Sequence, residues 1–358
     1  MVLIVAVGIP VPLLWALGRL TGHATPFVVA AVALTLGFLS GMANRSAMGE
    51  PSKLRLYGLM WPFFVYWTGA FLFAFIAPFV VATGAVLSAS LDASLRAALA
   101  VAGGVTLLAF IHRLRIHQRD VVIPSLPQAF DGYRIVQLTD LHCGPFASGR
   151  RVEGWVARAN RLNGDLIAVT GDLIASGSAF VSVVAGALGG LRAPDGVYAA
   201  MGNHDYFTDG ERMADALVDA GLDVLRNRGV EVQRDGARLF VAGVDDTWTG
   251  RNDVDKALEA RPAGVPAVLL AHDPALFPEA AARGVELTLS GHTHGGQLGV
   301  PFFQRRWNLA RMITGFTSGF YKLGESTLFV SHGLGTTGVP IRLLVPPEIA
   351  VITLRRAA

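Results

Sequence analysis

The fold is decided by the segment Tyr133–His142, which reads YRIVQLTDLH. Its first part, Tyr133–Thr139, is a short apolar run rich in β-branched residues, as expected of a buried strand. The polar triplet Asp140-Leu141-His142 follows where that strand would end. Because open α/β folds bind ligands just beyond the carboxyl ends of their strands, this segment predicts an α/β domain with a polar site at its strand tips.

A strand followed by polar residues recurs four more times along the chain. The polar groups are Gly171-Asp172, Gly202-Asn203-His204-Asp205, His272 and Gly291-His292-Thr293-His294. With His142, they include five of the nine histidines of the chain. We therefore expect all these side chains to converge in one crevice.

From Asp120 onward, short β-branched runs alternate with helix-length amphipathic stretches, which favours an α/β domain with a largely buried sheet. The expected strands are Tyr133–Thr139, Asp165–Thr170, Val197–Met201, Leu239–Gly243, Ala267–Ala271, Glu286–Ser290, Thr327–Ser331 and Ile349–Leu354. The expected helices are Arg150–Leu162, Phe180–Leu191, Glu211–Ala220, Val254–Ala260 and Ala275–Ala282.

The polar groups have the chemistry of a metal site. Carboxylate, imidazole and carboxamide together suit Mn²⁺, Fe or Zn²⁺ and do not suit a thiolate-selective metal. Asp-x-His and His-x-His would each place two side chains on one side of an extended strand tip, and Gly171, Gly202 and Gly291 would allow sharp turns there. Any one fragment is more often a turn, a helix cap or, for His272, a core histidine. Five such fragments in order, each at the end of a predicted strand, favour a shared metal site.

In this order the motifs resemble those of the calcineurin-like metallophosphoesterases, over roughly residues 120–358. The segments Ser290–Gln297, Ser331–Gly335 and Pro347–Ile349 are similar to a bacterial, often membrane-anchored branch. That branch is similar to phosphodiesterases acting on lipid-linked pyrophosphates, including UDP-2,3-diacylglucosamine hydrolases. The resemblance implies a sandwich of two mixed β-sheets flanked by helices. It leads us to expect Arg where this chain has His332, so no substrate contact is assigned there.

The resemblance also implies two divalent metal ions, bridged by Asp172. One metal would take Asp140, His142 and His294, and the other Asn203, His272 and His292. The metals would lower the pKa of a shared water, and the resulting hydroxide would attack phosphorus. His204 would donate a proton to the leaving alkoxide, with Asp205 orienting its imidazolium. The alternative for His204 is a structural role.

Three further features lie near these motifs. Cys143 follows a predicted ligand, and we expect it to pack in the core, since adjacent residues on a strand tip point apart. Val244–Trp248 follows another strand and is interpreted as a rim loop with capping acids. A basic aromatic cluster is either a solvated loop or a contact for lipid headgroups or substrate phosphates; it comprises Arg305, Arg306, Trp307 and Arg311.

The first 111 residues differ from the rest, since they hold only seven of the chain's charged residues. Four stretches are apolar enough to span a bilayer as helices, which takes about 20 residues: Val2–Leu20, Thr25–Ala43, Leu56–Leu91 and Leu95–Ile111. The third exceeds one span, and we interpret it as one long, tilted or interrupted helix, with two short spans as the alternative. Few polar groups interrupt the spans, which favours an anchor over a small transporter.

The positive charge lies beside these spans. Under the positive-inside rule, the loop with Arg45, Lys53 and Arg55 and the segment Arg113–Arg119 belong in the cytoplasm. Four spans satisfy this and leave both chain ends inside, whereas five would place the catalytic part outside. Residues 120–358 carry a net charge of −3 and no basic tract, so no nucleic-acid partner is expected. The single Cys143 excludes a disulfide framework.

These observations predict a membrane region at 1–112, a linker with an initial strand at 113–130, and a catalytic domain at 131–358. The predicted protein is a phosphoesterase anchored in a bacterial cell membrane with its catalytic domain in the cytoplasm. It would cleave a phosphodiester, phosphomonoester or pyrophosphate, with a diester favoured. The short distance along the chain from Ile111 to the catalytic domain favours a lipid-linked substrate. A catalytically weak scaffold or sensor is the alternative, and the oligomeric state stays open.

Overall fold

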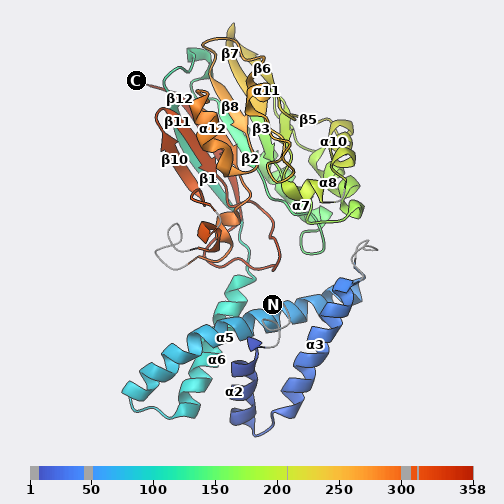
Figure 1. Ribbon diagram of the computed structural model, residues 1–358, viewed down its shortest axis with the longest axis vertical. Coiled ribbons are helices and arrows are strands. Elements are labelled where there is room, and N and C mark those ends of the chain that lie inside the picture. The colour runs from blue at the N-terminus through green and yellow to red at the C-terminus, as the bar shows by residue number, and fades with distance from the viewer. Residues whose placement is uncertain (1–7, 44–50, 208, 300–307, 313, 358) are drawn as a thin grey trace. The chain divides into compact units, whose positions relative to one another are not determined.

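The computed structural model describes residues 8–43, 51–207, 209–299, 308–312 and 314–357. Of the predicted basic aromatic cluster, Arg305, Arg306 and Trp307 lie outside these ranges. The chain divides into two compact units, Met1–Ile111 and His112–Ala358 (Figure 1).

The second unit contains two six-stranded mixed sheets. In spatial order, the first sheet comprises β1 (Arg115–Ile123), β12 (Glu348–Arg356), β2 (Arg134–Leu138), β3 (Leu166–Thr170), β4 (Val197–Ala200) and β5 (Asp223–Val224). The second comprises β10 (Gly319–Leu323), β11 (Ser326–Val330), β9 (Leu287–Ser290), β8 (Ala267–Leu270), β7 (Ala237–Gly243) and β6 (Arg228–Arg234). The pairs β12–β2, β10–β11 and β6–β7 are antiparallel and the remaining pairs are parallel.

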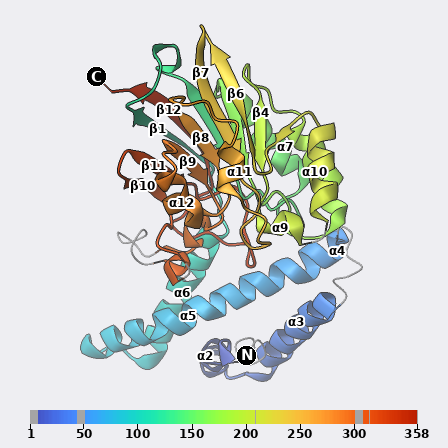
Figure 2. The same ribbon diagram turned by 45° about the horizontal axis from the view of Figure 1, so that its top comes forward.

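Helices cover the outer face of each sheet (Figure 1). The first sheet packs against α7 (Gly149–Asn160), α8 (Val181–Leu188) and α10 (Gly210–Asp219). The second is covered by α11 (Val254–Leu258) and α12 (Phe277–Ala282), as Figure 2 shows. Because strand side chains alternate, β3 sends Leu166 and Ala168 between the sheets and Ile167 and Val169 toward the helices. The predicted sandwich of two mixed sheets flanked by helices is confirmed.

The carboxyl ends of strands from both sheets are tied together by one buried side chain. Gln137 of β2 is fully buried, and its Nε2 donates to Thr170 Oγ1 at 2.8 Å and to the Ser290 carbonyl at 3.0 Å. Thr170 ends β3 and Ser290 ends β9. The polar segments that follow β2, β3 and β9 therefore begin side by side.

The first unit is a group of apolar helices. Its described helices are α2 (Val11–Thr21), α3 (Thr25–Ala43), α4 (Lys53–Arg55), α5 (Trp61–Val86) and α6 (Leu91–Ala109), with a π-helical turn at Leu56–Met60. Residues 53–86 form one continuous helix, as favoured for the third stretch. That helix and α6 are the two described helices long and apolar enough to cross a membrane. The count of four spans stays a prediction. The first predicted span, Val2–Leu20, begins outside the described residues, and the apolar part of α3, Thr25–Ser40, is shorter than the helices that are long enough to cross a membrane.

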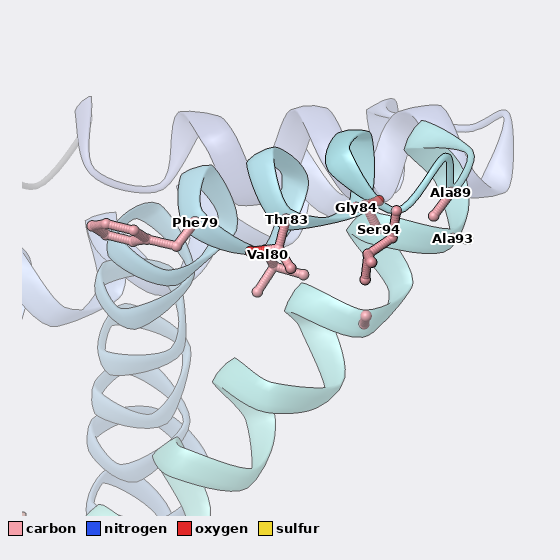
Figure 3. Close-up of a pocket in the computed structure, with 9 residues that line it drawn as sticks. Phe79, Val80, Thr83, Gly84, Ala89, Ala93 and Ser94 are labelled. Carbon is pink, nitrogen blue, oxygen red and sulfur yellow. The ribbon is translucent and has the colours of Figure 1, made fainter.

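Helices α5 and α6 approach closely at one end. A Cβ atom added to Gly84 would lie 2.0 Å from Ser94 Oγ, so a larger residue at position 84 would require Ser94 to move. Beside this contact the two helices border an open, mostly apolar hollow of about 380 Å³. Figure 3 shows the side chains that line it, among them Phe79, Val80, Thr83 and Ala89.

Candidate metal centre

Four acidic and histidine side chains form a first group at the ends of β2, β3 and β9. The group is Asp140, His142, Asp172 and His294, all buried, with one ligand atom of each within 4.8 Å of the others. His142 Nε2 lies 2.9 Å from His294 Nε2 and 3.5 Å from Asp172 Oδ2. His294 Nε2 also lies 3.3 Å from Asp140 Oδ1. Three loops from distant parts of the chain thus direct their ligand atoms toward one point.

A second group shares Asp172 with the first. It contains His272 and His292, whose facing nitrogens, Nε2 and Nδ1, lie 3.2 Å apart. His272 Nε2 is 3.3 Å from Asp172 Oδ1. Asp172 therefore presents Oδ2 to one group and Oδ1 to the other. The structure brings these six predicted ligands together, in the same two groups that the family resemblance implies.

The seventh predicted ligand, Asn203, begins the short helix α9 (Asn203–Tyr206). Its side chain is buried, and Oδ1 has no hydrogen-bond partner among the described residues. A buried acceptor without a partner is costly, and a bound cation would satisfy it. The donor set of carboxylate and carboxamide oxygens and imidazole nitrogens therefore fits hard or borderline divalent metals.

The backbone at these ligands is not extended, and the expectation of extended strand tips is wrong. Five predicted ligands have left-handed φ values: Asp140 (51°), His142 (45°), Asp172 (54°), His292 (70°) and His294 (51°). Such values are uncommon for residues other than glycine and cost energy, and they cluster at functional sites. The ligands therefore converge through tight left-handed turns, and the two-residue side-chain repeat of a strand does not explain their spacing.

The three glycines of the motifs act in two different ways. Gly171 has a φ of +87°, so it supplies the turn that the sequence predicts. Gly202 and Gly291 are not left-handed, and the turn explanation is wrong for them. Instead, an added Cβ at Gly202 would lie 2.4 Å from Asp172 Oδ1, and one at Gly291 would lie 2.1 Å from Asp140 Oδ2. These two glycines allow the backbone to approach the carboxylates.

Burial and mutual charge shift the pKa values of the histidines in opposite directions. Burial lowers the pKa of His142 to about 3 and of His292 to about 4, and it also lowers that of His294. These rings are neutral near pH 7, which is the form that binds a metal. Burial would lower the pKa of His272 too, but the charge of Asp172 and a hydrogen bond with it raise the value to about 10.

The pKa values of Asp140 and Asp172 are also shifted, in opposite directions. Burial raises the pKa of Asp140 to about 7. Burial also opposes ionisation of Asp172, yet the charge and hydrogen bond of His272 hold its pKa well below the ordinary value. His272 Nδ1 donates to the Thr170 carbonyl at 2.8 Å, which keeps Nε2 directed at Asp172. A cation between these groups would replace the shared proton.

His204 lies beside the first group, with its ring centroid 4.6 Å from that of His142. Its backbone N–H donates to Asp172 Oδ1 at 2.9 Å, and its Nδ1 lies 2.7 Å from the Ala175 carbonyl, to which it donates. The prediction that Asp205 orients this ring is wrong. Asp205 instead accepts hydrogen bonds from the N–H groups of Leu173 and Gly202 and is fully buried, so it holds backbone turns in place.

Sequence reasoning missed Arg342, a buried arginine next to the first group. Its Nη2 donates to the carbonyls of Gly335 at 2.6 Å and His332 at 2.8 Å, and it also lies 3.2 Å from His294 Nδ1. The two shorter bonds use both hydrogens of that nitrogen, so the contact with His294 is packing. Gly335 N–H in turn donates to the Asp140 carbonyl at 2.6 Å. No local signal distinguished Arg342 from a surface arginine.

The remaining predicted features are placed as follows. Cys143 is fully buried in the core between the first sheet and its helices. In the rim loop, Asp246 accepts a hydrogen bond from the Thr249 N–H at 2.8 Å, as a capping acid does. Arg311 is exposed in a 3-10 turn, Leu309–Met312.

Comparison with known proteins identifies the family. The calcineurin-like phosphoesterase family matches residues 133–296. The chain is 30% identical over 268 residues to the uncharacterized metallophosphoesterase YkuE of Bacillus subtilis, covering 72% of this chain and 92% of that protein. An uncharacterized metallophosphoesterase of Aquifex aeolicus is 32% identical over 252 residues, with 68% of this chain and 92% of the relative covered.

A longer relative is named as a transmembrane protein. A transmembrane protein with metallophosphoesterase domain from Danio rerio is 35% identical over 254 residues. The match covers 66% of this chain and 57% of the relative, so the chain spans little more than half of that protein. Together with the two long apolar helices, this relative indicates membrane association. The family matches, with two clusters of aspartate and histidine at the expected strand ends, show that the chain belongs to the calcineurin-like metallophosphoesterases, a family of metal-dependent phosphoesterases.

Proposed function

We propose that this protein is a membrane-anchored phosphoesterase that uses two divalent cations. The observation that carries the proposal is the position of Asp172, whose two carboxylate oxygens face different ligand groups at 3.5 and 3.3 Å from His142 and His272. A pair of catalytic cations about 3.5–4 Å apart needs such a shared anionic ligand. The family of the chain supports the same reading.

In this proposal each cation has its own ligands besides Asp172. One would be held by Asp140, His142 and His294, and the other by Asn203, His272 and His292. Two divalent cations there would supply a water of lowered pKa and bind phosphate oxygens. The protein contributes the fixed directions of the imidazoles, set by contacts such as that of His272 with the Thr170 carbonyl.

His204 is the proposed acid for the leaving group. Its Nδ1 proton is engaged by the Ala175 carbonyl, which leaves Nε2 to hold a proton for the departing oxygen. We expect His204→Ala to retain both metals and to lower turnover by about 100-fold on a poor leaving group, with a smaller loss on p-nitrophenolate. An unchanged rate on the poor leaving group would remove His204 from the mechanism.

The finer parts of the proposal concern substrate and location. We propose a phosphodiester or a lipid-linked pyrophosphate as the substrate, because the chain carries long apolar helices beside its catalytic unit in sequence. The cell membrane of a bacterium is the proposed location, with the catalytic unit in the cytoplasm. The distribution of arginine and lysine around the apolar stretches supports that orientation.

The deciding experiment measures metal content and hydrolysis on the purified full chain. We expect about two metals per chain and Mn²⁺-dependent cleavage of bis-p-nitrophenyl phosphate, p-nitrophenyl phosphate or a lipid-linked pyrophosphate. Asp172→Asn should lose both metals and at least about 100-fold in rate, while Asp219→Asn, an exposed carboxylate of α10, should change neither. Two bound metals without turnover on any substrate would instead favour the scaffold.

A further inference from the structure

Two exposed aromatic side chains border the candidate metal centre. Phe207 is 57% exposed and Trp248 is 63% exposed. Among the described residues of 112–358, they are the aromatic side chains that leave more than half of their surface to solvent. Aromatic rings bury large apolar areas when they find a partner, so this exposure requires an explanation.

Both rings contact a histidine of the centre. The Phe207 ring centroid lies 4.5 Å from that of His204, the proposed acid. The Trp248 ring centroid lies 5.5 Å from that of His292, a proposed ligand of the second group. Phe207 therefore lies next to the proposed acid for the leaving group, and Trp248 lies next to the second ligand group.

The two segments that carry these rings are fastened to one another. Tyr206, which precedes Phe207, donates a hydrogen bond to Asp245 of the rim loop that carries Trp248. Arg226 Nε bonds the other carboxylate oxygen of Asp245 at 3.0 Å, and the guanidinium of Arg251 lies 5.0 Å from the Tyr206 ring centroid. The aromatic positions are thus built into the fold and are not loose loop side chains.

We propose that Phe207 and Trp248 form an aromatic mouth that binds flat, aromatic substituents of the phosphoester. This inference rests on the proposed function, since it names the substrate class of the same site. Exposed ring faces attract other rings more than they attract saturated chains of equal size, because offset and edge-on ring contacts add to simple burial. Phe207 would contact the leaving group and Trp248 the second ester substituent.

Binding of phosphodiesters with poor leaving groups tests the proposal by calorimetry. The measurement uses the Mn²⁺-loaded full chain in detergent carrying His204→Ala, because that variant should keep both metals and cleave such probes slowly. The probes are diphenyl phosphate, dicyclohexyl phosphate of similar size, and diethyl phosphate. We expect diphenyl phosphate to bind at least about 5-fold more tightly than dicyclohexyl phosphate. Phe207→Ala and Trp248→Ala should each reduce that preference several-fold, Trp248→Phe should largely restore it, and Val218→Ala, which removes an exposed side chain of α10, should leave it unchanged.

A kinetic comparison distinguishes the role of Phe207 from that of Trp248. Bis-p-nitrophenyl phosphate and ethyl p-nitrophenyl phosphate share a leaving group and differ in the other substituent. Trp248→Ala should lower kcat/KM for the first about 5-fold more than for the second, whereas Phe207→Ala should lower both alike.

The outcomes distinguish this inference from the proposed function. A preference for diphenyl phosphate that depends on both rings, without any hydrolysis, would support the aromatic mouth and contradict the phosphoesterase. Hydrolysis with equal affinity for diphenyl and dicyclohexyl phosphate would contradict the aromatic mouth alone. Preferences that survive both alanine substitutions would also overturn it.

Discussion

Arg342 shows how a side chain outside the ligand set can fix a ligand. Its guanidinium is buried, and its hydrogen-bond acceptors among the described residues are backbone carbonyls, with the His294 ring packed against it. Through the turn at Gly335 it reaches the Asp140 carbonyl. Both Asp140 and His294 belong to the first group, so Arg342 acts on that group and has no contact with the second.

We therefore predict that Arg342→Lys weakens metal binding selectively. A lysine cannot reproduce the forked donors, so the full chain should retain close to one metal after dialysis and lose about 2 kcal/mol of unfolding free energy. Arg261→Lys is the matched control, because Arg261 also bonds several acceptors, including Glu286, in another part of the unit. It should lose stability without losing metal. Equal metal content in both variants would contradict the positioning role.

Glu348, which is not a predicted metal ligand, gives a pH-dependent prediction. Burial opposes its ionisation, but a hydrogen bond from His117 and the charge and N–H of His332 lower its pKa from 4.5 to about 2. Because the folded pKa lies below the unfolded one, the stabilisation is complete above about pH 4.5 and is lost as the pH falls toward 2.

Glu348→Gln should therefore cost about 2 kcal/mol near pH 6. The difference in unfolding free energy between wild type and variant, measured by denaturant titration, should be present at pH 5 and shrink as the pH falls from 4.5 toward 2. A difference that grows below pH 4.5 would show that Glu348 is stabilised in its protonated form.

At the residue scale, the residue types of the metal ligands could be predicted from the sequence, but the backbone conformation at these ligands could not. Asp172 and the five histidines follow strands in an order that indicates a metal site. The left-handed φ of His292 could not be read from the sequence, because such values are uncommon even for histidine, which adopts them more often than most residues. The prediction for Asp205 was wrong because a carboxylate next to His204 in the sequence suggests a partner for its ring. In the structure, Asp205 instead accepts a hydrogen bond from the backbone N–H of Leu173.

At the element scale, the strands that sequence reasoning missed all lie at sheet edges. These are β5, β6 and β10. Edge strands are often short or carry charges that discourage further pairing, and β6 carries Arg228, Glu231 and Arg234. A search for buried apolar runs finds central strands, since only those are covered on both faces.

Glycines in connecting turns test how each element positions the site. Gly171 (φ +87°) joins β3 to Asp172, and an added Cβ would lie 2.6 Å from the Gly202 nitrogen. Gly236 (φ +76°), in the β6–β7 hairpin, has no described heavy atom within 4 Å of its added Cβ. Gly236→Ala should cost only the left-handed strain, about 1 kcal/mol, and keep both metals. Gly171→Ala should cost at least about 3 kcal/mol and release metal, as metal analysis and thermal unfolding would show. Equal effects would mean that backbone strain alone matters at Gly171.

At the scale of the whole molecule, composition predicts a membrane region at 1–112 followed by a catalytic part, and the chain divides into compact units between residues 111 and 112. That the first unit is a membrane region stays a prediction. The number of spans was harder to predict. The helix at 53–86 has 34 residues, well beyond the roughly 20 that cross a bilayer, and hydropathy alone does not fix its tilt. Orientation therefore depends on the charges that flank the helices.

The last prediction tests that orientation with single cysteines in the full chain. The native Cys143 is buried, so wild type should not react with a membrane-impermeant maleimide and sets the background. His23, in the exposed turn between α2 and α3, lies outside the cell under the four-span arrangement, and Glu259, exposed beside α11, lies inside. His23→Cys should be labelled in intact cells, whereas Glu259→Cys should be labelled only after lysis. Labelling of Glu259→Cys in intact cells would place the catalytic unit outside the cell. With the amino terminus in the cytoplasm, an odd number of spans would then precede the catalytic unit.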